Sequence, residues 1–230
     1  MRALERGLRE GSTELGLTLD DAQIAQLLDY LDLIQKWTKV YNLTALREPA
    51  DMLTHHLLDS LAVVVPLRAE LTRLGRDGPS SAAFEGGATE RRANRLLDVG
   101  SGAGLPGVVI AICCPEVLVD CVDTVAKKAA FVRQVAATLK LPNLRGLHAR
   151  VENLTEQYEV VGSRAFASLS DFVSWSQGAL AANGVWMAMK GKRPDSEIAS
   201  VSECAQVFHV EHLTVPGLEA ERCIVWMRRT

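Results

Sequence analysis

The 230-residue chain lacks the features that identify several classes of protein. Its five cysteines are an odd number and include no Cys-x-x-Cys pair, so neither a zinc site nor a disulfide framework is predicted. Its longest apolar runs, near residues 61–67 and 105–114, are too short to span a bilayer, and its charged N-terminus lacks the apolar core of a signal peptide. These absences predict a cytoplasmic protein that binds neither a metal ion nor a membrane.

The chain also lacks the excess of basic residues that many nucleic-acid-binding proteins have. It carries 25 Lys and Arg residues against 28 Asp and Glu residues, a formal net charge of −3, so any contact with RNA depends on a local patch. Aromatic residues make up only 5% of the chain, and its tryptophans do not have the spacing of an RNA-recognition platform. The 48% of hydrophobic positions suffices for one core of fair size.

Beyond residue 95, predicted strands and helices alternate. Strands are expected near residues 95–99, 117–122, 144–149, 162–168, 184–190, 205–213 and 221–228, and helices near 106–113, 125–140, 170–181 and 195–203. This alternation predicts a mostly parallel sheet with helices on both faces. Since no helix separates the last two strands, they are expected to form an antiparallel hairpin at the edge. The predicted fold class is therefore α/β.

The domain organisation predicted from these patterns is one compact unit with three parts. Residues 1–66 form an N-terminal helical cap packed on the sheet, including a helix from Pro49 to Val65, and residues 95–230 form a Rossmann-like domain. Residues 67–94 are rich in Gly, Ser, Arg and Glu and cannot bury enough apolar surface to become ordered, which predicts a flexible insertion. An arm that contacts RNA is the alternative for this insertion.

The most informative segment is residues 96–107, where an apolar strand containing Asp98 leads into closely spaced glycines. Glycine lets the backbone turn sharply and approach a ligand closely. Gly102-x-Gly104-x-x-Gly107 satisfies the dinucleotide fingerprint, so an NAD-dependent oxidoreductase is one hypothesis. The Asp98 carboxylate would repel a pyrophosphate, which favours a cationic ligand such as S-adenosylmethionine, although Asp98 could instead cap a helix.

A second acidic residue, Asp123, ends the next predicted strand. In both cofactor classes such an acid accepts hydrogen bonds from the ribose hydroxyls, so it supports adenosine binding without choosing between them. A turn residue at the strand end is the alternative. Because ligands of such sheets bind outside the carboxyl ends of the strands, Gly100, Asp123, Glu152 and Arg164 should converge.

Several motifs carry a resemblance to one known family. The specific ones are Gly104-Leu105-Pro106-Gly107 and Ser163-Arg164-Ala165-Phe166-Ala167-Ser168-Leu169, and the supporting ones are Tyr41-Asn42-Leu43-Thr44, His56-Leu57-Leu58-Asp59-Ser60, Phe131-Val132-Arg133-Gln134-Val135 and Met189-Lys190-Gly191. With them the chain resembles the bacterial 16S rRNA guanine-N7 methyltransferases, once called glucose-inhibited division protein B. The resemblance implies a class I methyltransferase with a seven-stranded sheet, S-adenosyl-L-methionine as cofactor and the guanine N7 of the 530-loop hairpin as target.

The predicted cofactor site combines the strand-end argument with this resemblance. Its residues are Gly100, Gly102, Leu105, Asp123, Val151, Glu152 and Arg164. Arg164 lies beside the small and apolar residues 165–168 of an expected strand. The resemblance places it at the cofactor and substrate pocket, where a substrate-side role is a hypothesis; a salt bridge to a neighbouring acid is the alternative. Val151 and Glu152 would hold the adenine edge.

The expected partner is 16S ribosomal RNA, as the small ribosomal subunit or an assembly intermediate, and the protein is expected to be a monomer. Candidate RNA-binding residues are Lys127, Lys128, Arg133 and Lys190, with an ordinary solvated face as the alternative. No catalytic residue is expected, because guanine N7 has a free lone pair and no proton to remove. A cofactor-sensing RNA-binding protein without turnover is a third hypothesis.

The resemblance leaves the roles of three residues open. His55 and His56 are adjacent in a predicted helix, so they would point about 100° apart and do not suit one metal ion. Asn42 and His56 are expected to lean toward the mouth of the cofactor site. We interpret His56 as an orienting or packing residue.

Overall fold

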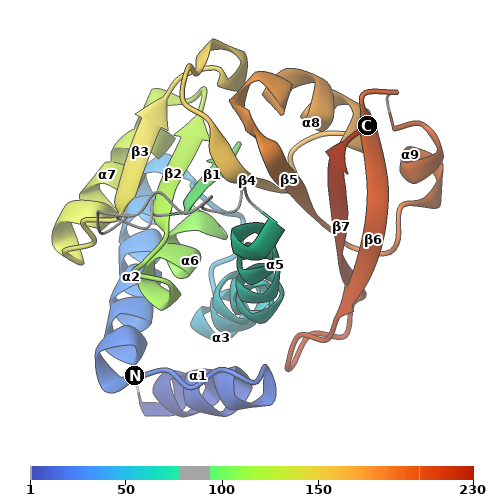
Figure 1. Ribbon diagram of the computed structural model, residues 1–230. Helices are drawn as coiled ribbons and strands as arrows, with labels where there is room; N and C mark the ends of the chain where they lie inside the picture. Colours follow the sequence, from blue (N-terminus) through green and yellow to red (C-terminus); the bar gives the residue numbers. More distant parts are fainter. Residues whose placement is uncertain (1, 78–93, 202) are drawn as a thin grey trace, which may run out of the picture.

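The computed structural model describes residues 2–77, 94–201 and 203–230, and its centre is one sheet (Figure 1). The strands are β1 (Arg95–Val99), β2 (Leu118–Asp123), β3 (Leu144–His148), β4 (Tyr158–Arg164), β5 (Leu180–Lys190), β6 (Ala205–Leu213) and β7 (Arg222–Arg229). The sheet has seven strands in the order β3-β2-β1-β4-β5-β7-β6. Only β7, which lies between β5 and β6, runs in the direction opposite to the other six strands. The predicted sheet and its terminal hairpin are confirmed.

Helices from the N-terminal part of the chain and from the first two crossovers cover one face of the sheet. They are α1 (Arg2–Glu14), α2 (Asp21–Tyr41), α3 (Pro49–Met52), the π-helical η1 (Leu53–Leu58), α4 (Asp59–Leu61), α5 (Val64–Asp77), α6 (Gly107–Cys113) and α7 (Ala126–Thr138). The carboxylate of Asp20 starts α2 by accepting a hydrogen bond of 2.8 Å from the backbone N–H of Gln23. Because α2 packs against α6 and α7, it extends the helical layer of the sheet.

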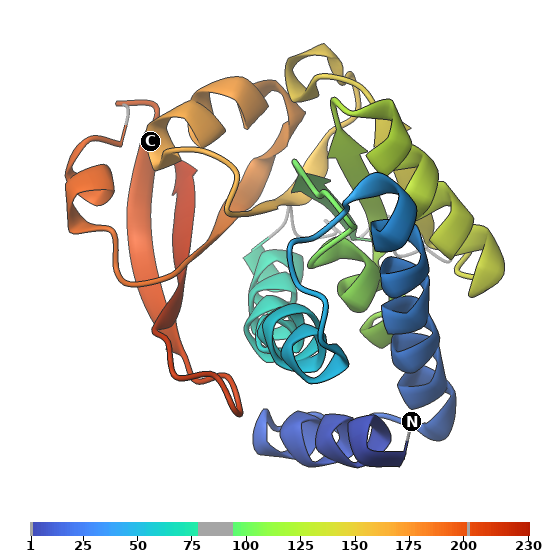
Figure 2. The same ribbon diagram turned by 180° about the vertical axis from the view of Figure 1, so that it is seen from behind.

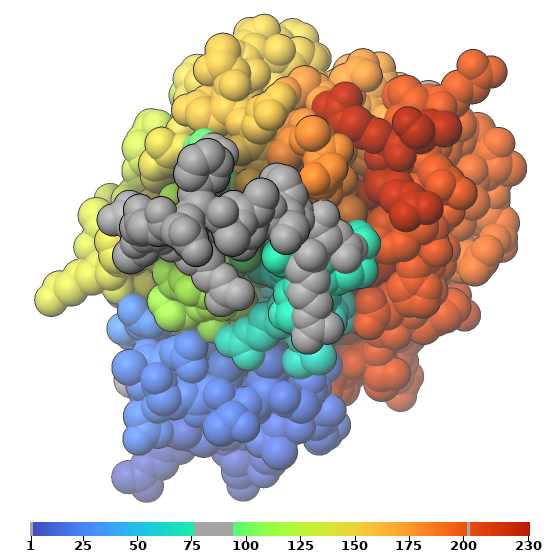
Figure 3. Space-filling view, viewed as in Figure 1, coloured from blue at the N-terminus to red at the C-terminus, as the bar shows by residue number. Residues whose placement is uncertain are grey.

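The other face carries fewer helical residues. They lie in η2 (Val151–Asn153), α8 (Leu169–Ser176), η3 (Gln177–Ala179) and α9 (Asp195–Ala199). Figure 2 shows α2 and α5 from behind, and Figure 3 shows the N-terminal segment, in blue, at the lower end of the molecule and the C-terminal segment, in orange and red, along one side. No helix within the described ranges is both long and apolar enough to cross a bilayer.

Buried side chains alternate along the strands between two apolar clusters, one on each face. In β1, Leu96 belongs to the cluster with α2, α6 and α7, whereas Leu97 and Val99 belong to the cluster with α8. This alternation follows from the two-residue period of a strand. With both faces covered, the sheet presents only the ends of its strands to a ligand.

Two predicted boundaries are wrong. Helix α5 continues to Asp77, so residues 67–77 are not a flexible insertion; Val64, Leu67 and Leu71 recur at helical spacing and are buried. The remainder of the predicted insertion, including its alternative role as an RNA-contacting arm, falls on residues 78–93, outside the described residues. Strand β4 spans 158–164 rather than 162–168, because the chain leaves the sheet at Ala165, whose φ is 50°.

Smaller differences concern two other elements. The helix expected from Pro49 to Val65 is divided into α3, η1 and α4 and ends at Leu61. The helix expected over 170–181 ends earlier, since α8 stops at Ser176 and β5 already begins at Leu180. The remaining predicted elements agree with the structure within a few residues.

Candidate active site

The loop between β1 and α6 turns at glycines, as the sequence predicts. Gly100, Gly102 and Gly104 have φ angles of 66°, 59° and 86°, a region that favours glycine. The backbone N–H groups of Gly100 and Ser101 donate to the carbonyl oxygen of Val122, at 2.9 and 3.2 Å. A Cβ atom on Gly100 would collide with the ring of Phe166, whereas one on Gly102 would project into open space. The loop is thus held against β2 and leaves room above Gly102.

A helix of the N-terminal region also holds this loop. Tyr30 of α2 is fully buried and donates a hydrogen bond of 2.6 Å to the carbonyl oxygen of Ala103. The sequence analysis missed this contact. The available signal was a tyrosine in the apolar stripe of α2, between Leu27 and Leu31, because a buried phenol needs a hydrogen-bond partner.

Asp98 lies beneath the loop and not at its mouth. Its side chain is fully buried, and its Oδ2 atom accepts a hydrogen bond of 2.9 Å from the backbone N–H of Gly107, at the start of α6. Burial raises the pKa of Asp98 to about 7. Asp98 lines neither of the cavities described below, so the argument that it repels a pyrophosphate is wrong. The helix-capping alternative describes its position.

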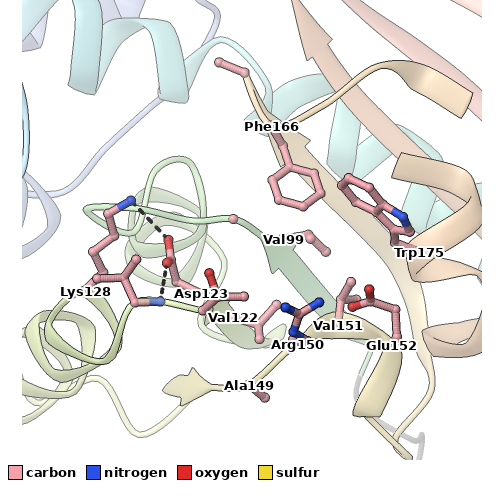
Figure 4. A pocket seen from close by; sticks show the side chains of 14 residues that line it. Val99, Val122, Asp123, Lys128, Ala149, Arg150, Val151, Glu152, Phe166 and Trp175 are labelled. Carbon is pink, nitrogen blue, oxygen red and sulfur yellow. Dashed lines mark hydrogen bonds and ion pairs between the residues drawn. The ribbon is translucent and has the colours of Figure 1, made fainter. Parts of the chain in front are cut away.

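The first cavity, of about 570 Å³, lies outside the carboxyl ends of β1, β2 and β3 (Figure 4). Val99, Val122 and Val151 form its apolar part, and Asp123 and Glu152 lie on different sides of these valines. A cavity of this size, apolar with a few polar groups at its edges, is typical of small-molecule sites.

Asp123 ends β2 at the glycine loop. Its carboxylate accepts hydrogen bonds from the backbone N–H groups of Gly102, at 3.1 Å, and Val125, at 2.8 Å. The Nζ atom of Lys128 lies 3.6 Å from the same carboxylate. Asp123 therefore shapes the turn after β2, as one alternative predicts, and it lies at the cavity edge, where the ribose-binding alternative requires it.

Two aromatic side chains bound the first cavity opposite the valines (Figure 4). Phe166 contacts Trp175 edge-on, with 5.8 Å between the ring centroids. The sequence analysis missed both residues. Trp175 is 41% exposed, because it lies outside the buried face of α8 that contains Phe172 and Val173. The helical spacing of these residues could have indicated the exposure of Trp175.

The second cavity, of about 560 Å³, shares Gly100 and Ala165 with the first. Its lining comes from the glycine loop, the ends of β4, β5 and β7, and the segment before and within η1. The residues are Leu43, Thr44, His55, His56, Asp59, Gly100, Ser101, Gly102, Ala103, Leu105, Arg164, Ala165, Met189, Lys190, Gly191 and Arg222. The two cavities meet at the carboxyl ends of β1 and β4.

Arg164 lines the second cavity and forms the salt bridge that the alternative predicts. Its Nη1 atom donates to the carbonyl oxygen of His55 at 3.0 Å and to Oδ2 of Asp59 at 2.9 Å. Lys190, at the end of β5, donates to the carbonyl oxygen of Ala167 and to Oε2 of Glu197, both at 2.8 Å. These partners fix both cations at the cavity wall.

His56 is a neutral group in the second cavity at neutral pH. Its Nε2 atom lies 2.9 Å from Oγ1 of Thr44, and its pKa is lowered to about 4, first by burial and then by the charge of Arg164. Asn42 does not lean toward either cavity, so that prediction is wrong. It ends α2 with a φ of 51° and accepts a hydrogen bond of 2.9 Å from Nη2 of Arg47.

The four predicted RNA-binding cations do not form one patch. Lys128 lines the first cavity beside Asp123, and Lys190 lines the second. Arg133 donates to the carbonyl oxygen of Gly146 at 3.2 Å, and Lys127 is exposed on the first turn of α7. The sequence grouped the three cations of α7 in one predicted patch, whereas the structure places them in different environments.

The sheet order, the glycine loop and the paired cavities define the class: an α/β methyltransferase of the S-adenosylmethionine-dependent class I fold. A solved structure, TrmN from Thermus thermophilus, supports the fold with a TM-score of 0.52 and 14% identity, covering 77% of this chain and 53% of that one.

Sequence comparisons identify the family. The family model described as GidB, rRNA small subunit methyltransferase G, matches residues 23–72 and 83–225. A protein named Ribosomal RNA small subunit methyltransferase G from Albidiferax ferrireducens is 66% identical over 230 residues, which are 100% of this chain and 99% of the relative. A protein of the same name from a Polaromonas species is 64% identical, over 99% of this chain and 95% of the relative. The chain therefore belongs to the rRNA small subunit methyltransferase G family. This membership favours the methyltransferase over the NAD-dependent oxidoreductase and over an RNA-binding protein without turnover.

Proposed function

We propose that the protein transfers a methyl group from S-adenosylmethionine to a guanine N7 of 16S ribosomal RNA, with the cofactor's nucleoside in the first cavity and the guanine in the second. The observation that carries this assignment is the shared boundary of the cavities at Gly100 and Ala165. Ligands held in the two cavities would meet there. We also propose that the protein acts in the cytoplasm as a monomer, on the free RNA or on a ribosomal particle.

The residues of the first cavity suit a nucleoside. The Asp123 carboxylate at the cavity edge can accept hydrogen bonds from ribose hydroxyls. The open space above Gly102, which lines the second cavity, leaves room for a ligand close to the shared boundary. Val151 and Trp175 offer apolar surface to adenine, and Glu152 offers an acceptor for its amino group. When bound, S-adenosylmethionine supplies an electrophilic methyl group on a sulfonium sulfur.

The reaction at guanine N7 requires the second cavity to orient the base and does not require it to remove a proton. Guanine N7 carries a lone pair and no proton, so orientation supplies much of the rate. The neutral imidazole of His56 and the apolar side chain of Leu105 can contact a base, and Arg164 and Lys190 can bind its phosphates or carbonyl oxygen. Lys127 and Arg133 remain candidate RNA contacts outside the two cavities.

The test is methyl transfer from labelled S-adenosylmethionine to small ribosomal subunits and, in parallel, to free 16S RNA. We expect the label on one guanine, at N7, recognised by strand cleavage after borohydride and aniline treatment. The Gly102→Val variant, whose side chain would enter the second cavity two residues from the shared boundary at Gly100, is the inactive control. Label on another atom, or none on either RNA, would contradict the proposal.

A further inference from the structure

Asp59 forms a buried ionic junction between three parts of the chain that are far apart in sequence. Its Oδ2 atom lies 2.9 Å from Nη1 of Arg164, at the end of β4, and its Oδ1 atom lies 2.7 Å from Nε of Arg222, at the start of β7. The side chain of Asp59 is only 5% exposed, while those of the arginines are 21% and 23% exposed. All three residues line the second cavity.

The charge of this junction is not balanced. One carboxylate faces two guanidinium groups, which leaves one positive charge at the cavity wall. Lys190 is paired with Glu197, and His56 is neutral because burial lowers its pKa to about 4. A partly buried charge without a counterion is unfavourable, so the junction suits an anionic ligand.

The arginines also retain hydrogen-bond donors. Arg222 donates through Nε to Asp59 and through Nη1 to the carbonyl oxygen of Glu221, and Arg164 donates through Nη1 alone. Among the described residues, the Nη2 group of Arg222 and the Nε and Nη2 groups of Arg164 have no hydrogen-bond acceptor. Guanidinium groups held in place with free donors are preorganised for phosphate oxygens.

The order of the strands places the two arginines at different distances from the glycine loop. Arg164 ends β4, the neighbour of β1, whereas Arg222 begins β7, which is three strands from β1. At the usual spacing of neighbouring strands, three steps amount to about 14 Å. Arg222 therefore lies at the side of the second cavity remote from the first cavity.

We propose that Arg222 binds a backbone phosphate of the RNA beside the target guanine, and that Asp59 is the positioning residue that holds Arg222 and Arg164 at the cavity wall. This inference rests on the proposed function. Asp59 lies between both guanidinium groups and offers one oxygen to each, so a single carboxylate aligns the cofactor-side and RNA-side cations.

The first test is the Arg222→Gln variant, which removes the charge but keeps a polar side chain. We expect the KM for small ribosomal subunits to rise about tenfold, the loss typical of a charged hydrogen bond. The slope of log affinity against log salt should fall by about 0.7 to 0.9, the value of one phosphate contact. Affinity for S-adenosylhomocysteine, measured by calorimetry, should stay within about twofold of the wild type. Arg228→Gln is the matched control, because Arg228 is exposed at the opposite end of the same strand.

The second test is Asp59→Asn, which keeps the shape of the side chain and removes its charge. We expect kcat to fall about tenfold while RNA binding at low salt is retained and its salt slope steepens, since two uncompensated cations remain. A merely structural role would lower the melting temperature without changing the slope. The proposal is overturned if Arg222→Gln keeps the KM and the salt slope of the wild type. It is also overturned if this variant instead lowers the affinity for S-adenosylhomocysteine. RNA binding is measured in the absence of methyl transfer. A failure of this inference can therefore be distinguished from a failure of the proposed function, in which the wild-type protein would not methylate the RNA.

Discussion

Replacing His56 by glutamine should change how the stability of the protein depends on pH. Two buried groups titrate in opposite directions: burial lowers the pKa of His56 from 6.5 to about 4 and raises the pKa of Asp98 from 3.8 to about 7. Between these values the folded protein resists protonation of His56 and favours protonation of Asp98. As the pH falls, His56 therefore destabilises the fold and Asp98 stabilises it.

The magnitudes follow from the pKa values of the folded and unfolded chains. Each unit corresponds to about 1.4 kcal/mol, so His56 removes up to about 3 kcal/mol of stability between pH 6.5 and 4. Over the range from pH 7 down to 3.8, Asp98 adds up to about 4 kcal/mol. In the wild type these two contributions nearly cancel. His56→Gln leaves the Asp98 contribution alone, so this variant should gain about 3 kcal/mol relative to the wild type as the pH falls from 6.5 to 4.

The measurement is urea unfolding followed by tryptophan fluorescence at several pH values from 4 to 7.5. Asp98→Asn is the reciprocal variant, and it should lose stability relative to the wild type over the same range because only the His56 contribution remains. The other titrating groups are common to all three proteins and cancel in the differences. Curves of His56→Gln and the wild type that run parallel would refute the reasoning.

Four further substitutions test the site and the fold. Gly102→Val should abolish binding of S-adenosylhomocysteine in calorimetry while circular dichroism stays native, since the φ of 59° disfavours a branched residue and the new side chain would occupy the open space that the ligand needs. Asp123→Ala should weaken the same binding about tenfold or more, as expected for a lost charged acceptor; unchanged affinity would exclude the ribose role. Trp175→Ala should weaken the binding of S-adenosylhomocysteine severalfold and remove the change in tryptophan fluorescence that follows addition of the cofactor. If the fluorescence change remained, the nucleoside would not lie beside Trp175. Asp120→Ala should cost roughly 3 kcal/mol in urea unfolding without affecting the cofactor, because the buried carboxylate binds Arg95, Arg145 and Tyr158.

The sequence predicted the edge of the sheet where the site lies because parallel topology determines it. Once strands and helices alternate, the carboxyl ends of the strands lie together whatever the details of the loops. Gly100, Asp123 and Glu152, which come from three different segments, accordingly line one cavity. The glycine spacing predicted a turn, and three of its glycines do have positive φ angles.

The sequence could not decide between the two roles predicted for Asp98, because a motif does not show the direction of a side chain. Along β1 successive side chains point to opposite faces, and Asp98 points to the face that α6 covers. A carboxylate one residue further along the strand would have faced differently. The electrostatic argument for the cofactor class therefore rested on a residue that the ligand does not meet.

The ionic junction at Asp59 could not be predicted for a different reason. Its partners are 105 and 163 residues away, and no local pattern marks such a pairing. The extension of α5, in contrast, was readable from apolar residues at positions 64, 67, 71 and 74, which recur at helical spacing. The polar and glycine-rich composition of the residues that follow led to the prediction of an insertion in place of this short helix.

The phosphate contact proposed for Arg222 would give the RNA backbone a part in the reaction. Methylation at N7 leaves the guanine with a positive charge, and the cavity wall carries one unbalanced positive charge from Arg164 and Arg222. Two like charges in a partly buried cavity repel each other more strongly than in water. A phosphate bound at Arg222 would neutralise the wall before the guanine becomes charged. A guanine within an RNA strand brings this phosphate with it, whereas a free base does not, so the electrostatics of the cavity favour methylation of the polymer.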